Sequence, residues 1–180
     1  AMLGMLKNAP VVYLGTFSKT LFPSLRIGFM VLPSALAKAA LPAIGSLLRG
    51  GHRAEQRTLA LFIEEGHYAR HLGAMRRLYR KRYRQLREVL SAELHVSHRV
   101  LAGEGGMHLT VAIDGIDDSA IVQQASAFQL APAALSGYYL DAKQGQTGLV
   151  LGYGSTSASH FTPGIRRLQK LITLQQGGKA

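Results

Sequence analysis

The 180 residues suffice for one domain with a substantial core or for two small lobes, and a composition with 47% hydrophobic and 17% charged residues is typical of globular proteins rather than disordered ones. The lack of cysteine excludes disulfides, thiolate catalysis and cysteine-based zinc sites, and charged residues and glycines interrupt every apolar run before membrane-spanning length. Basic residues outnumber acidic ones by 21 to 10, and this net charge of +11 favours phosphate-bearing partners, from nucleotides to nucleic acid.

The first third of the chain predicts two strands and two helices. The runs VVYLG (11–15) and RIGFMVL (26–32) are short and apolar and predict two buried strands joined by a loop. Ser34 is a plausible N-cap for an alanine- and leucine-rich helix that ends near residues 50–51. A further helix is predicted from about residue 54 to 65.

A long amphipathic helix is predicted over residues 67–94. Its apolar residues recur at spacings of three and four, and basic residues occupy the other faces. At about 1.5 Å per residue the helix would span roughly 40 Å, which is enough to link two lobes. The apolar positions are Leu72, Met75, Tyr79, Tyr83, Leu86 and Leu90.

The remaining residues predict a small α/β lobe. MHLTVAI (107–113) alternates like a half-buried strand, and Asp117 or Asp118 could cap a helix that runs to about Phe128. A short strand over 130–135, a strand at GLVLGYG (148–154) and a final helix over 159–174 complete a β-α-β-β-α order.

The loop between the first two strands carries the strongest chemical signal. A lysine between buried strands is costly unless it is paired, neutralised or used covalently. Near Lys19 lie the hydroxyls of Thr16 and Ser18 and the guanidinium of Arg26, whose planar fork suits two phosphate oxygens. A neighbouring cation and partial desolvation would both favour the neutral amine that forms a Schiff base.

An imine-forming lysine beside a phosphate cradle describes an anchor for pyridoxal 5′-phosphate. Lys19 would meet the aldehyde, and Thr16, Ser18 and Arg26 would hold the phosphate. The alternative is a solvated hairpin whose lysine and arginine point outward, and the spacing by itself leaves both interpretations open.

The segment YLGTFSKTLFPSLRIGFMVLP (13–33) resembles the cofactor-lysine segment of fold-type I pyridoxal-phosphate enzymes. In particular it is similar to that of the aminotransferase-like domain of MocR/GabR-type transcriptional regulators of the GntR family. The resemblance continues in EQRTLALFIEEGHYARHLGAMRRLYRKRYRQL (55–86), GGMHLTVAI, GLVLGYG and GIRRLQKLI, so it covers nearly the whole chain. It implies Lys19 as the internal-aldimine lysine, Arg26 as the phosphate arginine, and Thr16 and Ser18 as the hydroxyl positions before the lysine.

The resemblance also implies an architecture. The chain is similar to the C-terminal portion of the aminotransferase-like unit: part of the large lobe (1–70), a linking long helix (71–95), a small α/β lobe (96–176) and a tail (177–180). The family's acidic partner of the pyridine nitrogen, its ring-stacking aromatic and its N-terminal winged-helix DNA-binding domain have no matching motif here. Cofactor chemistry as an electron sink would therefore be impaired, the fragment alone need not retain the cofactor, and full transaminase activity is not expected.

Val150 stands where many aminotransferases of this fold place an arginine that clamps the substrate carboxylate. This difference favours effector sensing over amino-acid turnover. The expected function is thus effector sensing within a regulator, with an amine or amino acid as effector, DNA contact only through the absent domain, a homodimer, and a cytoplasmic location.

Two other functions remain as alternatives. One is a fragment of a fold-type I aminotransferase with the same lysine chemistry. The other is a basic nucleic-acid-binding module without cofactor, because eight of the 21 basic residues lie between Arg70 and Arg87. These basic residues surround an apolar stripe, and this arrangement is more typical of a solvated helix face than of a nucleic-acid-binding surface.

His67 and His71 have helical metal-ligand spacing, but no further ligand motif accompanies them, so no metal site is expected.

Overall fold

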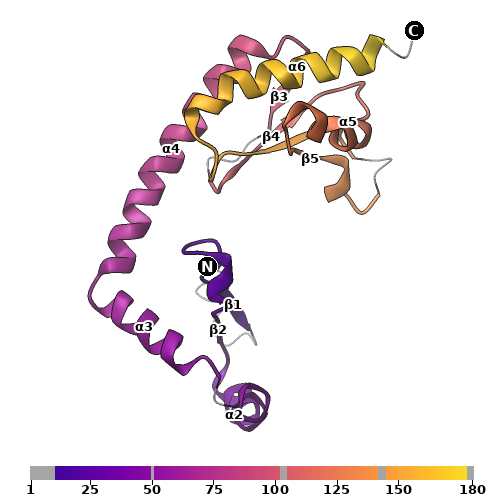
Figure 1. The fold of residues 1–180 in the computed structure, drawn as a ribbon. Helices are drawn as coiled ribbons and strands as arrows, with labels where there is room; N and C mark the ends of the chain where they lie inside the picture. The colour runs from indigo at the N-terminus through magenta and orange to yellow at the C-terminus, as the bar shows by residue number, and fades with distance from the viewer. Residues whose placement is uncertain (1–10, 50, 102–104, 142–144, 178–180) are drawn as a thin grey trace. The chain divides into compact units, whose positions relative to one another are not determined.

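A computed structural model describes residues 11–49, 51–101, 105–141 and 145–177 of the chain. The chain divides into two compact units, residues 1–73 and 74–180. The division falls inside the long helix α4 (His67–Glu93), which Figure 1 shows as a continuous helix. The lobe boundaries expected from the sequence remain a prediction, and of the expected tail the residues 178–180 lie outside the described ones.

The first unit contains a two-stranded antiparallel sheet and helices. Strand β1 (Tyr13–Thr16) pairs with β2 (Gly28–Val31), in a register that sets Tyr13 opposite Val31 and Thr16 opposite Gly28. Between the strands lies the one-turn helix η1 (Pro23–Leu25). After β2 follow α2 (Ser34–Leu48), α3 (Arg53–Glu64) and the first turns of α4.

The first unit has little core of its own. Among its described residues Leu59 is the only buried apolar side chain, whereas Leu14, Leu41 and Leu47 are 71%, 68% and 82% exposed. All four residues of β2 are exposed. The expectation that both strands are buried is therefore wrong for this chain, because two strands of apolar residues need covering layers on both faces and the described residues do not supply them.

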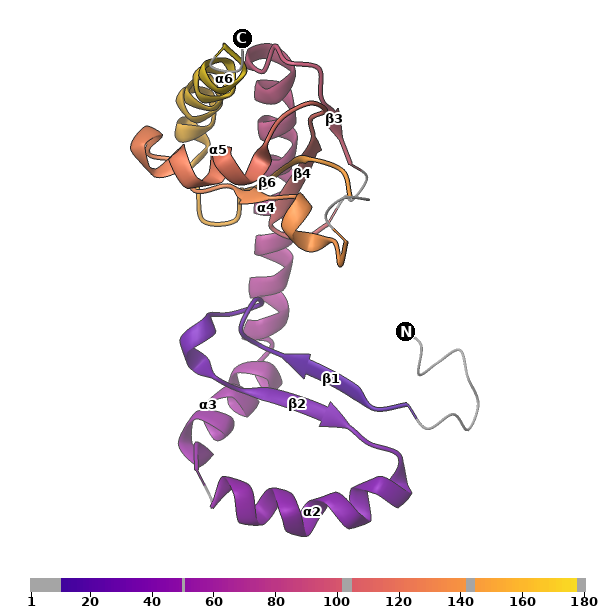
Figure 2. The same ribbon diagram turned by 90° about the vertical axis from the view of Figure 1, so that its right-hand side faces the viewer.

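The second unit has a four-stranded antiparallel sheet covered by helices (Figure 2). The strand order is β3-β4-β6-β5, and the helices are α5, α6 and the C-terminal half of α4. The elements have the following bounds: β3 (Arg99–Val100), β4 (His108–Ala112), α5 (Asp118–Ala125), η2 (Ser126–Phe128), β5 (Ala133–Ala134), η3 (Ser136–Tyr138), β6 (Gly148–Gly152), η4 (Ala158–His160) and α6 (Phe161–Gly177).

The core of the second unit joins residues from every large element. Leu109 and Val111 of β4 and Leu149 of β6 are buried against Leu90 of α4 and Ile172 of α6. Burial of such side chains contributes about 1.5–3 kcal/mol each. This unit therefore has the packed interior that the first unit lacks.

Asp118 is a buried carboxylate inside this unit. It is 2% exposed and accepts hydrogen bonds from the Ser136 backbone N–H at 2.9 Å, the Ser136 hydroxyl at 2.6 Å and the Gly148 N–H at 3.0 Å. Burial alone would raise the pKa of this carboxyl. The hydrogen bonds from Ser136 and Gly148 outweigh that cost and set the pKa below its ordinary value. The carboxylate thus joins α5 to both β6 and η3.

The described helices do not include one that combines the length and the apolar character of a membrane span. The α/β class expected from the sequence is confirmed by the elements observed.

Candidate functional site

The candidate site is the loop of residues 17–27, which joins β1 to β2 in the first unit. The Phe17 N–H donates to the Ile27 carbonyl oxygen at 3.2 Å and closes the loop. The Thr20 and Leu21 N–H groups both donate to the Phe17 carbonyl oxygen, at 3.2 and 2.8 Å. These bonds wind the backbone into a turn around Lys19.

The two hydroxyls that precede the lysine lie together. The Thr16 hydroxyl donates to the Ser18 hydroxyl oxygen at 2.9 Å, and the Ser18 N–H donates to the Thr16 hydroxyl oxygen at 3.2 Å. This side-chain-to-backbone bond two residues apart is a serine/threonine turn, which fixes the chain direction immediately before Lys19. The sequence-predicted pair Thr16 and Ser18 is therefore brought together.

The residue after the lysine is held from the start of α4. Tyr68 donates its hydroxyl to the Thr20 hydroxyl oxygen at 3.0 Å, and the His71 Nε2 donates to the Thr20 carbonyl oxygen at 2.9 Å. The ring of Phe17 meets the Tyr68 ring edge-on, with centroids 5.7 Å apart, and lies 5.6 Å from the ring of Phe29. These contacts anchor the loop on both sides of Lys19.

Sequence reasoning missed this anchor. Tyr68 and His71 are 48 and 51 residues away from Thr20, so no local spacing could reveal the contact. The spacing of His67 and His71 is also that of a helical metal-ligand pair. In the structure the His71 Nε2 is bonded to Thr20, and the two nitrogens of His67 meet Glu65 and Arg70.

Arg26 has an unusual backbone conformation. Its φ of 53° and ψ of 29° are left-handed, and its N–H closes η1 by donating to the Pro23 carbonyl oxygen at 3.4 Å. A left-handed conformation costs a residue with a Cβ roughly 1–2 kcal/mol relative to glycine. Arg49, His52 and Gln129 also have a positive φ, so the conformation of Arg26 is compatible with a functional use of its side chain without assigning one.

The chemical groups of the loop fit one end of pyridoxal 5′-phosphate. Lys19 and Arg26 are exposed, and neither side chain has a hydrogen bond or ion pair to another described residue. The loop thus offers one amine for an aldehyde, and one guanidinium with two hydroxyls for a phosphate. Residues 17–27 include no carboxylate that could pair with a pyridine nitrogen. The exposure of Lys19 also means that the desolvation expected from the sequence is not found in this chain.

The basic residues of α4 have different environments. The charged side chains at positions 76, 77, 80, 81 and 84 are exposed. Arg82 is half-buried and donates to the carbonyl oxygens of Tyr153, at 3.5 Å, and of Gly154. Arg87 lies over the Tyr83 ring at 5.8 Å. Part of this charge therefore serves the packing of the second unit.

Comparison with known proteins shows the protein family to which the chain belongs. The model of the family "Aminotransferase class I and II" matches residues 2–136. The chain belongs to this family. The solved multiple substrate aminotransferase from Thermococcus profundus has the same fold, with a TM-score of 0.82 at 23% identity over 97% of this chain and 43% of that one. Pyrococcus horikoshii kynurenine aminotransferase gives 0.80 at 26% identity, over 93% of this chain and 42% of that one.

The curated relatives include proteins that are named as regulators. YhdI of Bacillus subtilis, described as an uncharacterized HTH-type transcriptional regulator, is 31% identical over 92% of this chain and 35% of its own length. The probable rhizopine catabolism regulatory protein MocR of Rhizobium meliloti is 32% identical over 99% of this chain and 36% of its own length. The resemblance to MocR-type regulators and to the fold-type I aminotransferases is thus confirmed. The chain spans about a third of the length of these relatives.

Proposed function

We propose that the chain is the aminotransferase-like part of a MocR-type transcriptional regulator and senses an amine or amino-acid effector through pyridoxal 5′-phosphate bound by the Lys19 amine. One observation carries the proposal. Lys19, Arg26 and the paired hydroxyls of Thr16 and Ser18 share one short loop, whose backbone is anchored at Thr20 and strained at Arg26.

Each side chain of the loop has a role in this proposal. The Lys19 amine would hold the cofactor by condensing with its aldehyde, with loss of water, and the Arg26 fork would bind two phosphate oxygens. The Thr16 and Ser18 hydroxyls, which are now hydrogen-bonded to each other, would instead donate to the phosphate. The bound group supplies a carbonyl-type centre that amines can attack, which is what makes an amine or amino acid the expected effector.

The side chain of Val150 supports sensing over turnover. It lies in β6, opposite Thr110 of β4 and Ala133 of β5. An aliphatic side chain cannot hold a substrate carboxylate bidentately, as an arginine would. Val150 thus lacks a contact that would favour turnover, while the binding groups of the loop stay in place.

The same proposal includes the remaining partners. A regulator of this type would contact DNA through a helix-turn-helix domain outside these 180 residues, in the cytoplasm, and would act as a homodimer. The exposed charge of α4 is then a solvated face rather than a DNA-reading surface.

The proposal is tested by titrating the chain with pyridoxal 5′-phosphate and recording visible absorbance. The wild-type chain should develop a visible absorbance band that borohydride abolishes. The control variant Lys38→Ala, which lacks an exposed lysine of α2, should develop the same band. Lys19→Ala should develop no such band. Equal bands in all three proteins would show that lysines react unselectively and would refute the assigned role of Lys19.

An aminotransferase fragment is the second candidate, because the 2-aminoadipate transaminase of Thermus thermophilus is 27% identical over 90% of this chain. The two candidates differ in product. A sensor should change its visible spectrum when an amino acid is added and release no keto acid. Release of keto acid in repeated turnovers would establish the enzyme instead.

A further inference from the structure

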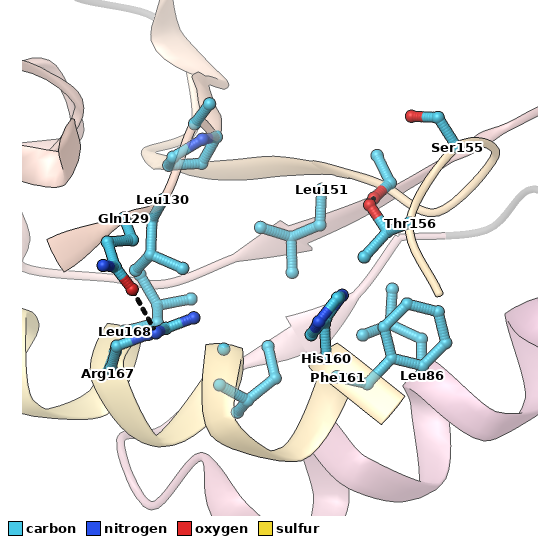
Figure 3. Close-up of a pocket in the computed structure, with 15 residues that line it drawn as sticks. Leu86, Gln129, Leu130, Leu151, Ser155, Thr156, His160, Phe161, Arg167 and Leu168 are labelled. Carbon is cyan, nitrogen blue, oxygen red and sulfur yellow. Dashed lines mark hydrogen bonds between the residues drawn. The ribbon is translucent and has the colours of Figure 1, made fainter. Parts of the chain in front are cut away.

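The second unit contains a pocket that neither the proposed function nor the family assignment uses. Its volume is about 420 Å³, and its walls come from α4, α6, β6 and the segment after η2. Figure 3 shows Arg167 and Gln129 at one end, Ser155 and Thr156 at the other, and Leu151 and His160 between them. This volume is near the lower end of the roughly 300–1,000 Å³ of small-molecule sites.

At one end of the pocket lies Arg167, a cation that has no counter-ion among the described residues. Arg167 of α6 donates from Nη1 to the Gln129 side-chain oxygen at 2.8 Å. Its Nε is buried and has no hydrogen-bond partner among the described residues, and no described carboxylate pairs with the guanidinium. The preceding Arg166 differs, because its Nε and Nη2 are both bonded to the Glu93 carboxylate at 2.8 Å. Arg167 is thus oriented by Gln129 but not neutralised.

The charge of the lining favours an anion. Among the 15 described lining residues, Arg167 and His160 are the only basic ones and none is acidic. A partly buried guanidinium without a counter-charge is costly, and an ionised partner makes stronger hydrogen bonds with it than a neutral one does. A carboxylate has the planar geometry that matches the guanidinium nitrogens left free by Gln129.

The body of the pocket is apolar. Its wall carries aliphatic and aromatic side chains from three elements and the segment after η2: Leu86, Leu130, Leu151, Phe161, Ile165 and Leu168. Gly164 leaves room on the same wall, since a Cβ there would meet only the Leu130 side chain, at 3.9 Å. An apolar chain of a ligand would displace water from this wall, which favours binding.

We propose that this pocket binds a small carboxylic acid with an apolar body, with its carboxylate on Arg167 and its hydrocarbon part along Leu151 and Leu168. The site is separate from the Lys19 loop, and its occupancy requires no cofactor. The ligand class is set by the single cation, by the lack of acidic lining residues and by the apolar wall.

The test uses the 180-residue chain, isothermal titration calorimetry and two probes of equal shape, hexanoate and hexanamide. Hexanoate should bind at least about tenfold more tightly than hexanamide, because only hexanoate carries a negative charge that can pair with Arg167. Arg167→Met should weaken hexanoate binding by about tenfold or more. Lys170→Met removes the same charge from the same helix outside the pocket and should change the affinity by less than about twofold.

A second variant makes the result independent of any folding defect in Arg167→Met. Gly164→Leu should fill the pocket and abolish hexanoate binding, while the helical circular dichroism signal is kept or raised, because leucine has a higher helix propensity than glycine. Lys19→Ala should bind hexanoate like wild type, which separates this site from the proposed cofactor site. Equal affinity for hexanoate and hexanamide, no binding of either, or equal losses in Arg167→Met and Lys170→Met would overturn the proposal.

Discussion

Arg26 connects backbone strain to the proposed chemistry of the loop. Its left-handed conformation closes η1, a task that glycine performs without steric cost. Local structure therefore does not explain why an arginine occupies the position. The proposed role of its guanidinium as a phosphate ligand would account for it.

Arg26→Gly should weaken binding of the cofactor while leaving the stability of the fold nearly unchanged. The free energy of unfolding should stay within about 1 kcal/mol of wild type, because relief of strain offsets the greater freedom of glycine in the unfolded chain. Affinity for pyridoxal 5′-phosphate should fall by at least about tenfold, since the charged hydrogen bonds to phosphate are lost. Arg49→Gly is the matched control, because Arg49 is also left-handed, with a φ of 44°, and ends α2 away from the loop. If both variants bound the cofactor equally well, Arg26 would not be a phosphate ligand.

Asp118 is the residue on which the second unit should depend most. Its ionised carboxylate accepts two backbone N–H bonds on one oxygen and the Ser136 hydroxyl bond on the other, and asparagine would replace these charge-assisted bonds with weaker neutral ones. Asp118→Asn should lower the free energy of unfolding by about 1–3 kcal/mol in urea titrations. Asp117→Asn, at the neighbouring position, should be nearly neutral, because Asp117 is the N-cap of α5 and asparagine caps equally well. Equal losses in the two variants would contradict the assigned role.

The same carboxylate sets a pH dependence. Its folded-state pKa is lowered, so its contribution is complete above the unfolded-state pKa of about 3.9 and is lost as the pH falls through the folded-state value. Wild type should therefore lose stability on acidification below about pH 4 more steeply than Asp118→Asn does. Parallel curves for the two proteins over this range would show that the carboxylate is not the group responsible.

Among the elements, the pairing of β4 with β6 depends on one glycine. A Cβ on Gly148 would lie 2.1 Å from the Val111 carbonyl oxygen, and the Gly148 φ of 155° is one that other residues rarely adopt. Gly148→Ala should thus force the strands apart and destabilise the unit by several kcal/mol, of the order expected for severe overpacking. Gly152→Ala, at the other end of β6, is the control, because its Cβ would meet His108 at an ordinary 3.6 Å. A melting temperature of Gly148→Ala close to that of Gly152→Ala would contradict this account.

The helices were predictable because their signals are local. The apolar spacing of α4 placed it within one residue of its observed bounds, and Asp117 caps α5 as one of two expected candidates. Ser34 is the first residue of α2 and makes no capping bond; Pro33 is the N-cap. Strand β3 was missed and β5 is much shorter than expected, because two-residue strands are defined by their partners rather than by a pattern of their own.

The candidate site was predictable for the same reason. Thr16, Ser18, Lys19 and Arg26 lie within eleven residues of one another. The anchor from Tyr68 and His71 and the pocket around Arg167 were not predictable, since they join residues that only the fold brings together. Their residue types carry no motif that sequence spacing could detect.

For the whole molecule, the exposed apolar surface of the first unit predicts self-association. Exposed leucines of α2, together with exposed apolar residues of β1 and β2, exceed what a monomer usually leaves uncovered. Sedimentation equilibrium should detect dimers or larger species. The double variant Leu41→Ser/Leu47→Ser should weaken this association. Leu174→Ser removes an exposed leucine of the second unit and should have little effect. A strictly monomeric chain at high concentration would contradict the prediction.

The central claim is that Lys19 is the residue that binds the aldehyde of the cofactor. The most direct measurement is peptide mapping by mass spectrometry after incubation with pyridoxal 5′-phosphate and borohydride reduction. The phosphopyridoxyl group should be found on Lys19, ahead of the other six lysines of the chain. An unmodified Lys19, or a label spread evenly over the exposed lysines, would contradict the claim.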